Sequence, residues 1–433
     1  MNVKKIKDFL FRVRDTLQIQ DEETYKRLTI RIRHQGVSLR DEARGTNIGT
    51  KSQFWAKGGQ FIVSKIDARW GAFGIIPDYI DKAIITGNFW TYEIDTKQVT
   101  MEWFHFFTST EQFVQICKFA STGVTNRQYL DEKTFLNLEI PLPSLVEQEA
   151  IVQKIKGFMA THSQAKAQIE ALQTDLKAYR KSILQEAIKG NFTATWRANN
   201  PTEKIDLKTL KKENTKKQKP LAAIKIDEMH FELPQNWSWV RLGEGLENIK
   251  YGTSKKCESN FGKTPVLRIP NVVLGKLNLE DLKYADFTEE ERKDISLNVG
   301  DLLLIRSNGS KNLVGKTCIY DNESKDFLYA GYLIRIRPVH HFNSYYLQYV
   351  FETPFIRNQI EAPIRTTTGV HNINSTEIQN LPFPLPPLTE QAEIVRILEE
   401  KMATIAAAEE QLKALLAEQS LLQKSMMQEV FRG

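Results

Sequence analysis

The chain repeats itself about half its length apart, so any fold for it must accommodate the same unit twice. The segment PLPSLVEQEAIVQKI at residues 141–155 returns as PLPPLTEQAEIVRIL at residues 384–398, which is 243 positions further on. The match continues without a gap to Gly190 and Gly433, and 16 of its last 44 positions are identical. Chance does not give such a match over an ungapped stretch. The sequence therefore predicts an internal duplication with pseudo-twofold symmetry.

Both copies of the repeat carry the apolar heptad pattern that is typical of long paired helices. Apolar residues recur at alternating steps of three and four over about four heptads. A seam this narrow needs a partner, and the most economical partner is the other copy. We therefore expect the two helices to pair as an antiparallel coiled coil. The residues predicted to form the seam are Ile155, Ile169, Leu172 and Leu176 in the first helix and Leu398, Leu412, Leu415 and Leu422 in the second.

The segments outside these helices contain short apolar runs that predict strands. Examples are QFIVSKI at residues 60–66, DLLLIRS at residues 301–307 and GYLIRIRP at residues 331–338, each rich in branched residues and bounded by turn formers. The sequence thus predicts an α+β fold with two β-rich globular domains separated by two long helices. The expected divisions are a first globular domain at 1–142, a helix at 143–190, a Lys-rich linker at 191–230, a second globular domain at 231–386 and a helix at 387–433.

Each globular unit carries a basic, polar segment directly after a predicted buried strand, and a second polar cluster before its Pro-Leu-Pro. Arg and Lys side chains hold phosphates or read guanine, Asn reads adenine, and Ser can do either. Because both clusters recur in both units, they favour a DNA-binding site over a solvated loop. The predicted DNA-contacting residues are Lys65, Arg69, Trp70, Thr125, Asn126 and Arg127 in the first unit and Arg306, Ser307, Asn308, Ser310, Lys311, Lys316, Arg365, Thr367, His371 and Asn372 in the second.

The sequence carries no recognisable catalytic or metal-binding constellation. Cys117, Cys257 and Cys318 are too widely spaced for a zinc motif or a disulfide framework, which fits a reducing cytoplasm. No methyltransferase motif or nucleophile elbow is present. The net charge of +6 is compatible with nucleic-acid binding. No run of about eighteen apolar residues predicts a membrane span.

Two functions without DNA recognition stay open. Gly315, Lys316 and Thr317 match the second half of a phosphate-binding loop, which would suggest a nucleotide-hydrolysing enzyme. The first glycine of that motif falls on Ser310, however, and the aligned segment of the first unit keeps a glycine, Gly74, without a following lysine. We therefore interpret the segment as a strand–loop–strand element. The other alternative is a coiled-coil scaffold with no DNA role.

The arrangement resembles the DNA-specificity (S) subunit of type I restriction–modification systems. The resemblance covers nearly the whole chain. It is carried by the two PLPxLxEQxxIV segments, the two KS[IM][LM]QE helix ends, and two segments of the second unit, NWSWVRLGEGLENIKYGTS at 236–254 and LNVGDLLLIRSNGSKNLVGKTCIYD at 297–321. The first unit departs from the pattern, because no counterpart of NWSWVRLGE opens it.

The resemblance implies a division of labour. Each globular unit would be a target recognition domain that reads one half of a bipartite, asymmetric site in double-stranded DNA. The helices would set the spacing between the half-sites and bind two methyltransferase (M) subunits. Those partners would bring S-adenosylmethionine, and restriction (R) subunits, where present, would bring ATP and Mg. The chain itself would be non-catalytic and would bind no cofactor.

Overall fold

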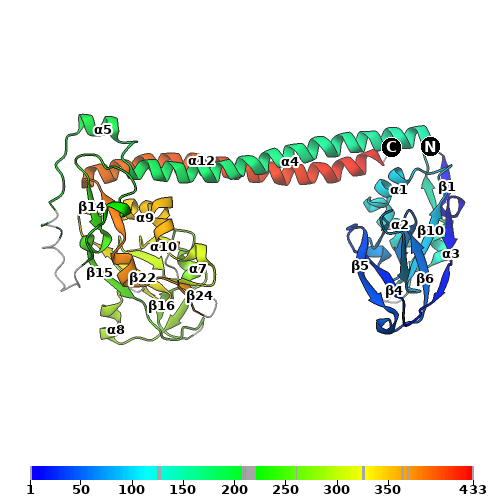
Figure 1. Ribbon diagram of the computed structural model, residues 1–433, viewed down its shortest axis with the longest axis horizontal. Coiled ribbons are helices and arrows are strands. Elements are labelled where there is room, and N and C mark those ends of the chain that lie inside the picture. The colour runs from blue at the N-terminus through cyan, green and yellow to red at the C-terminus, as the bar shows by residue number, and fades with distance from the viewer. Residues whose placement is uncertain are drawn as a thin grey trace. The chain divides into compact units, whose positions relative to one another are not determined.

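The two halves of the duplication fold as two units (Figure 1). Each unit also includes one end of each long helix. Unit 1 comprises residues 1–170 and 413–433, and unit 2 comprises residues 171–412. The computed structural model describes residues 2–123, 128–206, 208, 210, 221–259, 261–323, 327–361, 365–367 and 370–431, with the backbone alone at 365–367 and 370.

Unit 1 contains two main sheets and three short helices. The first sheet has the order β2-β10-β7-β8, with β2 at Leu10–Val13, β10 at Phe89–Ile94, β7 at Phe61–Ser64 and β8 at Phe73–Ile75. The second has the order β3-β6-β9-β4-β5, with β3 at Thr16–Gln18, β6 at Ser52–Lys57, β9 at Lys82–Ile85, β4 at Thr24–Ile30 and β5 at Val37–Arg44. Two small pairs are β1 (Val3–Lys5) with β13 (Glu139–Pro141) and β11 (Ser121–Thr122) with β12 (Tyr129–Leu130). The helices are α1 at Met101–Thr108, α2 at Glu111–Phe119 and α3 at Glu132–Asn137.

Unit 2 repeats the first of these sheets and varies the rest. Its four-stranded sheet has the order β15-β22-β18-β20, with β15 at Leu246–Tyr251, β22 at Leu333–Pro338, β18 at Leu302–Ile305 and β20 at Thr317–Ile319. Two three-stranded sheets are β17-β16-β21 (Lys283–Ala285, Thr264–Leu267, Leu328–Tyr329) and β19-β24-β23 (Ser307–Asn308, Val370–Asn372, Arg365–Thr367). β14 at Ser238–Arg241 pairs with β25 at Pro382–Leu385. The helices are α5 at Ala194–Asn199, α7 at Ile269–Val272, α8 at Glu289–Asp294, α9 at Ser344–Glu352, α10 at Pro354–Glu361 and α11 at Ser375–Gln379.

Unit 1 does open with a counterpart of the second unit's first segment, which the sequence comparison missed. β1 pairs with β13 as β14 pairs with β25. A short 3₁₀ turn follows each strand and is capped in the same way. The Lys5 N–H donates to the Asp8 carboxylate at 3.1 Å, and the Arg241 N–H donates to the Glu244 carboxylate at 3.0 Å. VKKIKD thus corresponds to WVRLGE, although no position is identical.

A buried glutamine from the repeated Glu-Gln pair holds the start of the first long helix, α4 (Leu145–Ile188), against the rest of unit 1. The Gln148 Oε1 accepts from the backbone N–H of Thr100, the N-cap of α1, at 2.8 Å. The Gln148 Nε2 donates to the carbonyls of Gln98 and Pro143, each at 2.9 Å. One side chain therefore ties together α4, α1 and the Pro-Leu-Pro segment.

The second copy repeats these three bonds at the start of α12 (Leu388–Val430). The Gln391 Oε1 accepts from the N–H of Asn343, the N-cap of α9, at 2.8 Å. The Gln391 Nε2 donates to the carbonyls of His341 at 2.9 Å and Pro386 at 2.8 Å. Both glutamines are fully buried. The repeated motif therefore has a structural reason, because a buried amide must keep all of its hydrogen bonds.

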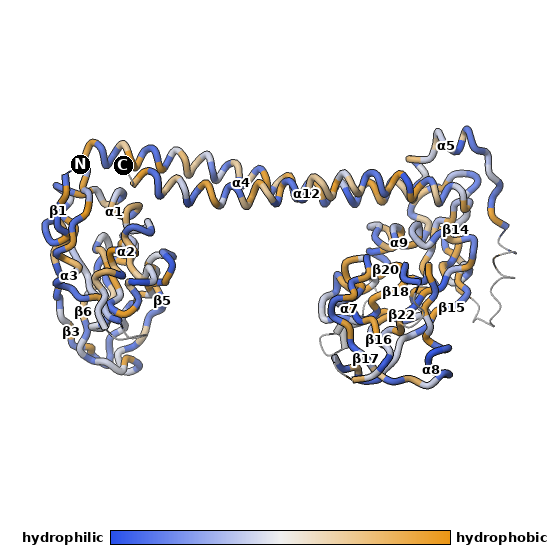
Figure 2. Tube along the Cα trace, turned by 180° about the vertical axis from the view of Figure 1, so that it is seen from behind, coloured by the Kyte–Doolittle hydropathy of each residue, from blue (hydrophilic) through white to orange (hydrophobic). Residues whose placement is uncertain are grey.

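The two long helices are antiparallel in both units. In unit 1 the first turns of α4 share a core with the last turns of α12, through residues such as Ile155 and Met427. In unit 2 the last turns of α4 share a core with the first turns of α12, through residues such as Ile183 and Leu398. Figure 2 shows hydrophobic and hydrophilic residues alternating along both helices, as a helical seam requires.

Three of the residues predicted for the seam lie outside it. Leu172, Leu415 and Leu422 are 51%, 44% and 49% exposed, whereas Ile155 and Leu398 are buried. Ile169 is also buried, and Leu176 and Leu412 are half-buried.

The register departs from the predicted one in the middle of the helices. There the half-buried positions fall on Gln173, Leu416 and Gln419. The ring of His162 on α4 hydrogen-bonds to the Gln419 carbonyl of α12 at 2.9 Å. An α-helix has 3.6 residues per turn, whereas a heptad pattern corresponds to 3.5 residues per turn. The apolar stripe of a strict heptad therefore moves around a straight helix, and polar residues come to lie in the seam.

Charged substitutions should separate the true seam from the exposed leucines. We expect Ile155→Lys or Leu398→Lys to destabilise the protein by roughly 3 kcal/mol or more, because each removes a buried side chain and buries a charge. Leu172→Lys and Leu415→Lys are the matched controls and should change stability by no more than about 0.5 kcal/mol. The thermal midpoint of each variant measures the difference. Equal losses in all four variants would contradict the observed register.

Candidate nucleic-acid interface

The basic residue directly after β7 in unit 1 and directly after β18 in unit 2 occupies the same backbone position. In unit 2 the Arg306 N–H donates to the Tyr332 carbonyl, and the Arg306 carbonyl accepts from the Ile373 N–H, both at 2.9 Å. In unit 1 the Lys65 N–H donates to the Asn88 carbonyl, and the Lys65 carbonyl accepts from the Leu130 N–H, both at 2.8 Å. Arg306 and Lys65 are therefore structural equivalents. Each begins the segment that joins β18 to β20 in unit 2 or β7 to β8 in unit 1, which we call the tip of that unit.

The two polar clusters of unit 2 come together in one small sheet. β19 follows Arg306 directly and pairs with β24, so that Ser307 lies opposite Asn372 and Asn308 opposite His371. β24 in turn pairs with β23, which places the backbone of residues 365–367 beside them. Segments about sixty positions apart in the chain thus form one continuous tip.

The polar residues of this tip differ in their hydrogen bonds, exposure and ion pairs. The Asn308 Oδ1 accepts from the Ser310 N–H at 2.8 Å and shapes the turn. Ser310, Lys311 and Lys316 are exposed. Neither lysine has a carboxylate within ion-pair distance among the described residues.

Arg306 also lines a cleft of about 790 Å³ in unit 2. Its guanidinium lies over the ring of Tyr251 at 4.7 Å, and its Nε is buried without a hydrogen-bond partner. Tyr332, on the rim, is 60% exposed. The other cations of the cleft are Lys255, Lys256, Arg268 and Lys283.

Most of the cleft cations are already neutralised. Lys255 pairs with Glu291 at 2.7 Å, Lys256 with Glu258 at 2.9 Å, and Arg268 with Asp281 at 2.8 Å. Over the described part of the chain, Arg306 and Lys283 have no such carboxylate partner. Cations without carboxylate partners, flanked by exposed tyrosine rings, can hold phosphate and stack on bases.

Tyr251, Lys283 and Tyr332 were not predicted from the sequence, because they belong to three separate strands or strand ends. The sequence signal nearest to them is the run YGTSKK at residues 251–256, which alone is typical of many loops. The pairing of β15 with β22 and the pairing of β16 with both β17 and β21 bring these segments together.

In unit 1 the corresponding tip is rich in tryptophan. The Lys65 Nζ lies 5.6 Å from the ring of Trp90, and the Arg69 guanidinium lies 5.4 Å from the ring of Trp70. The Arg69 Nη1 also donates to the Gln128 side chain at 3.0 Å, which joins the tip to β12. Trp70 is 55% exposed. The predicted contacts at Thr125, Asn126 and Arg127 lie outside the described residues.

The segment around Lys316 is not a phosphate-binding loop. The Gly315 N–H donates to the Ile305 carbonyl at 2.8 Å, and the Lys316 N–H donates to the Leu313 carbonyl at 3.2 Å, so neither amide is available to phosphate. Thr317 is buried and begins strand β20, whereas a phosphate-binding loop leads into a helix.

The structure also corrects the alignment of the two tips. Gly315 has φ +83° and its counterpart in unit 1 is Gly71, with φ +80°, rather than Gly74. Gly74 pairs with β7 at the position where Cys318 pairs with β18. The tip of unit 2 is therefore three residues longer than that of unit 1.

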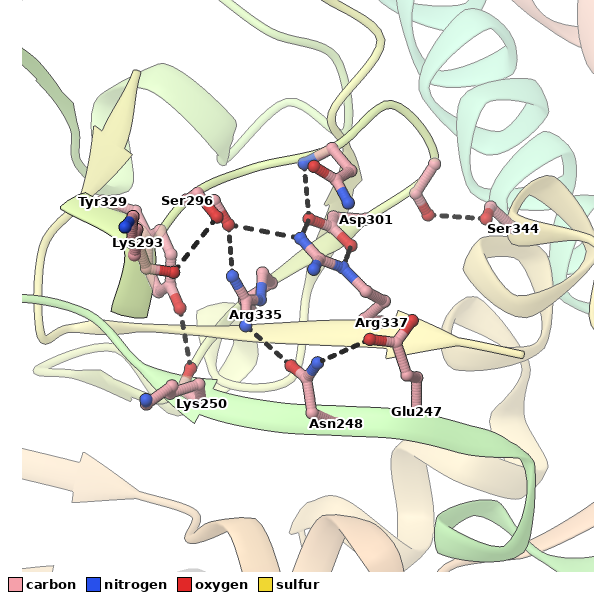
Figure 3. Close-up of polar contacts among 12 residues, drawn as sticks. Glu247, Asn248, Lys250, Lys293, Ser296, Asp301, Tyr329, Arg335, Arg337 and Ser344 are labelled. Carbon is pink, nitrogen blue, oxygen red and sulfur yellow. Dashed lines mark hydrogen bonds and ion pairs between the residues drawn. The ribbon is translucent and has the colours of Figure 1, made fainter. Parts of the chain in front are cut away.

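A buried polar network braces the strand that begins after Tyr332 (Figure 3). Arg337 on β22 donates from Nε and Nη2 to the two carboxylate oxygens of Asp301, each at 2.7 Å. Arg335 donates to the carbonyl of Ser296 and, at 2.7 Å, to the side chain of Asn248 on β15. The bonds with Asp301 raise the pKa of Arg337, while burial lowers the pKa of Arg335.

The equivalent corner of unit 1, where the turn before β7 meets β10, is held by different side chains. Asp301 accepts from the Asn298 N–H at 2.7 Å, and Gln60 accepts from the Lys57 N–H at 2.9 Å in the equivalent turn. At the position in unit 1 that corresponds to the Arg337–Asp301 ion pair, the Gln60 Nε2 donates to a carboxylate oxygen of Glu93 at 2.7 Å. In unit 2 the carboxylate lies in the turn and the donor lies on the strand. In unit 1 the donor lies in the turn and the carboxylate lies on the strand.

The described residues contain no cluster of three His, Cys, Asp or Glu side chains that could hold a metal ion. Burial raises the pKa of the Cys318 thiol to about 12 and that of Cys117 above its ordinary range, which suppresses their nucleophilicity. No helix among these residues is long and apolar enough to cross a membrane.

Known proteins share this architecture. Two solved structures match over 100% of this chain. The HsdS subunit from Thermoanaerobacter tengcongensis has a TM-score of 0.57 at 18% identity, with 96% of that chain covered. A chain from a study of complex assembly and conformational transition in the type I R-M system has a TM-score of 0.68 at 17% identity, with 97% covered. At these identities the likeness shows the fold.

Sequence relatives agree with the fold. The EcoKI type I restriction enzyme specificity subunit of Escherichia coli K12 is 30% identical over 297 residues, and the StySPI specificity subunit of Salmonella potsdam is 27% identical over 297 residues. Each match covers 68% of this chain and 57% of the relative, so the chain spans little more than half the length of these proteins. The model of the type I restriction modification DNA specificity domain matches residues 1–172 and 234–417. The chain belongs to this family of type I restriction–modification specificity proteins.

Proposed function

We propose that the chain is the DNA-recognition subunit of a type I restriction–modification complex and that it carries no catalytic step. The observation that carries this proposal is the structural equivalence of Lys65 and Arg306, two cations at matching tips of two duplicated units. A protein that reads a bipartite DNA site needs two such tips. Different side chains on a common framework allow the two half-sites to have different sequences.

The contacts divide between the two units. Lys65, Arg69 and Trp70, together with Thr125, Asn126 and Arg127, are proposed to contact one half-site. Arg306 and the residues of its tip, joined by Lys283 and the two exposed tyrosines of the cleft, are proposed to contact the other. Recognition domains at 1–142 and 231–386 follow from this division.

The exposed leucines of the long helices support a docking role toward methyltransferase subunits. Leu415 and Leu422 are seven residues apart on α12, and Leu172 and Tyr179 are seven apart on α4, so each pair shares one helix face. All four side chains are exposed. Large apolar side chains repeated along an exposed helix face are typical of a protein interface. In this proposal two methyltransferase subunits supply S-adenosylmethionine, and restriction subunits, where present, supply ATP and Mg, all in the cytoplasm.

Deleting the gene tests the proposed function. Adenine methylation at a single bipartite motif should disappear from host DNA when the gene is removed and return when it is restored. Methylome sequencing of the deletion strain and the complemented strain provides the measurement. A methylation pattern that does not change with the gene would refute a role in DNA recognition.

Equivalent substitutions in the two tips should affect different half-sites. We expect Arg306→Ala and Lys65→Ala each to weaken or relax recognition of one half-site by about 1–3 kcal/mol, because each removes a cation at the DNA surface. Methylation kinetics of the assembled complex on duplexes varied in one half-site at a time provides the readout. Each variant is the control for the other. An effect of both variants on the same half-site, or on neither, is incompatible with the assignment.

Charge on the exposed helix face should block assembly without unfolding the chain. The double variant Leu415→Arg, Leu422→Arg is expected to keep its thermal midpoint and to lose co-purification with the methyltransferase. Ala417→Arg is the matched control, since Ala417 is exposed on the opposite flank of α12. Normal assembly of the double variant would exclude this face as the docking surface.

A further inference from the structure

Unit 1 carries a basic hairpin that neither tip described above includes. β4 and β5 pair along their whole length, from Thr24 opposite Arg44 to Ile30 opposite Val37. In unit 2 the consecutive strands β16 and β17 pair over only three positions. The turn that joins β4 to β5 has the sequence RIRHQG at residues 31–36. The hairpin is therefore a special feature of unit 1.

The outer part of this hairpin is not held by its sheet. β4 pairs with its inner neighbour β9 at one position alone, Arg27 opposite Ile84. Beyond that position the two strands separate, and a cleft of about 290 Å³ opens beside Arg27, Leu28 and Ile30. The turn consequently needs another anchor.

That anchor is the tip of unit 1 itself. The Arg33 N–H donates to the Trp70 carbonyl at 2.6 Å, and the His34 N–H donates to the Gly71 carbonyl at 3.3 Å. The ring of His34 packs edge-on against Phe73, with 5.4 Å between ring centres. The turn and the tip are therefore one continuous surface.

The backbone of the turn is strained to make this contact. Arg33 and His34 have φ values of +60° and +57°, and they are the non-glycine residues with positive φ in the described chain. Such left-handed conformations cost roughly 1–2 kcal/mol per residue and persist where surrounding contacts impose them. Gly71 favours glycine for two reasons, because its φ is +80° and a Cβ there would lie 3.1 Å from the His34 backbone nitrogen.

The turn that docks on the backbone of Trp70 and Gly71 carries two arginines. Arg31 and Arg33 are exposed, and among the described residues neither has an ion-pair partner. By contrast, the guanidinium groups of Arg27 and Arg44, nearer the base of the hairpin, are paired with Asp41 and Glu22. Arg31 and Arg33, at the end that docks on the tip, thus lack the carboxylate partners that Arg27, Arg40 and Arg44 have.

We propose that this turn is a second DNA-contacting element of unit 1, in which Arg31 and Arg33 bind backbone phosphates beside the tip that carries Arg69 and Trp70. The inference rests on the proposed DNA-recognition function and extends it to residues outside the duplicated framework. Guanidinium groups bind phosphate oxygens through charge-assisted, bidentate hydrogen bonds. The turn is hydrogen-bonded to the backbone of Trp70 and Gly71 and both arginines are exposed, so a duplex that covers the tip also reaches the turn.

The salt dependence of DNA binding tests this inference. The assembled complex of the full chain with its methyltransferase is titrated with a duplex that carries the methylated motif, at several salt concentrations. The plot of log affinity against log salt should become shallower by roughly 1 for each phosphate that is no longer bound, so by about 2 for Arg31→Gln, Arg33→Gln. Affinity should fall by a similar factor for duplexes with altered half-sites, because phosphate contacts carry no sequence information.

Two further variants serve as controls. Arg44→Gln removes a paired cation from the other end of the hairpin and should leave the slope unchanged. Arg31→Lys, Arg33→Lys keeps both charges and should retain most of the slope. An unchanged slope in the double Gln variant, with normal assembly, would overturn the inference. A wild-type complex with no salt-dependent binding to the duplex would instead overturn the proposed function itself.

Discussion

The buried glutamine at the start of each long helix is the contact on which the rest of each unit depends. Gln148 and Gln391 each join a long helix, the N-cap of a domain helix and the Pro-Leu-Pro segment through three hydrogen bonds. Each amide is fully buried, so the loss of any of these bonds would leave an unsatisfied polar group in the core. The globular part of a unit is thereby fixed to the first turn of its helix. Each helix therefore sets the orientation of the globular part that is joined to its first turn.

Much of this architecture could be predicted from the sequence because the duplication and the apolar periods are strong signals. The strand segments QFIVSKI, DLLLIRS and GYLIRIRP form β7, β18 and β22. What failed were details that depend on tertiary context. Leu415 is exposed because a heptad pattern does not specify which of two adjacent leucines faces the partner once polar residues enter the seam. Likewise, the equivalence of Gly71 with Gly315 is hidden by a loop of different length.

The two candidate interfaces also differ in how far the sequence could reveal them. Their common part, the basic residue after the central strand, is visible in the repeat. The parts that distinguish them come from unrelated insertions: a cleft with Tyr251 and Lys283 in unit 2, and the hairpin turn with Arg31 and Arg33 in unit 1. Charge alone does not identify such residues, because a number of cations in both units are paired with carboxylates, as Arg27 and Lys255 are. The distinction depends on ion-pair geometry, which letters do not encode.

The corner that contains Asp301 and Arg337 in unit 2 and Gln60 and Glu93 in unit 1 limits how these units can be recombined. A hybrid that joined the turn of unit 2 to the strand of unit 1 would place the buried carboxylate of Asp301 beside that of Glu93, with no cation between them. The reverse hybrid would leave Arg337 facing an uncharged amide. Each corner is thus compatible only with its own strand. Exchange between related proteins should therefore preserve whole recognition units, with junctions in the long helices rather than within a sheet.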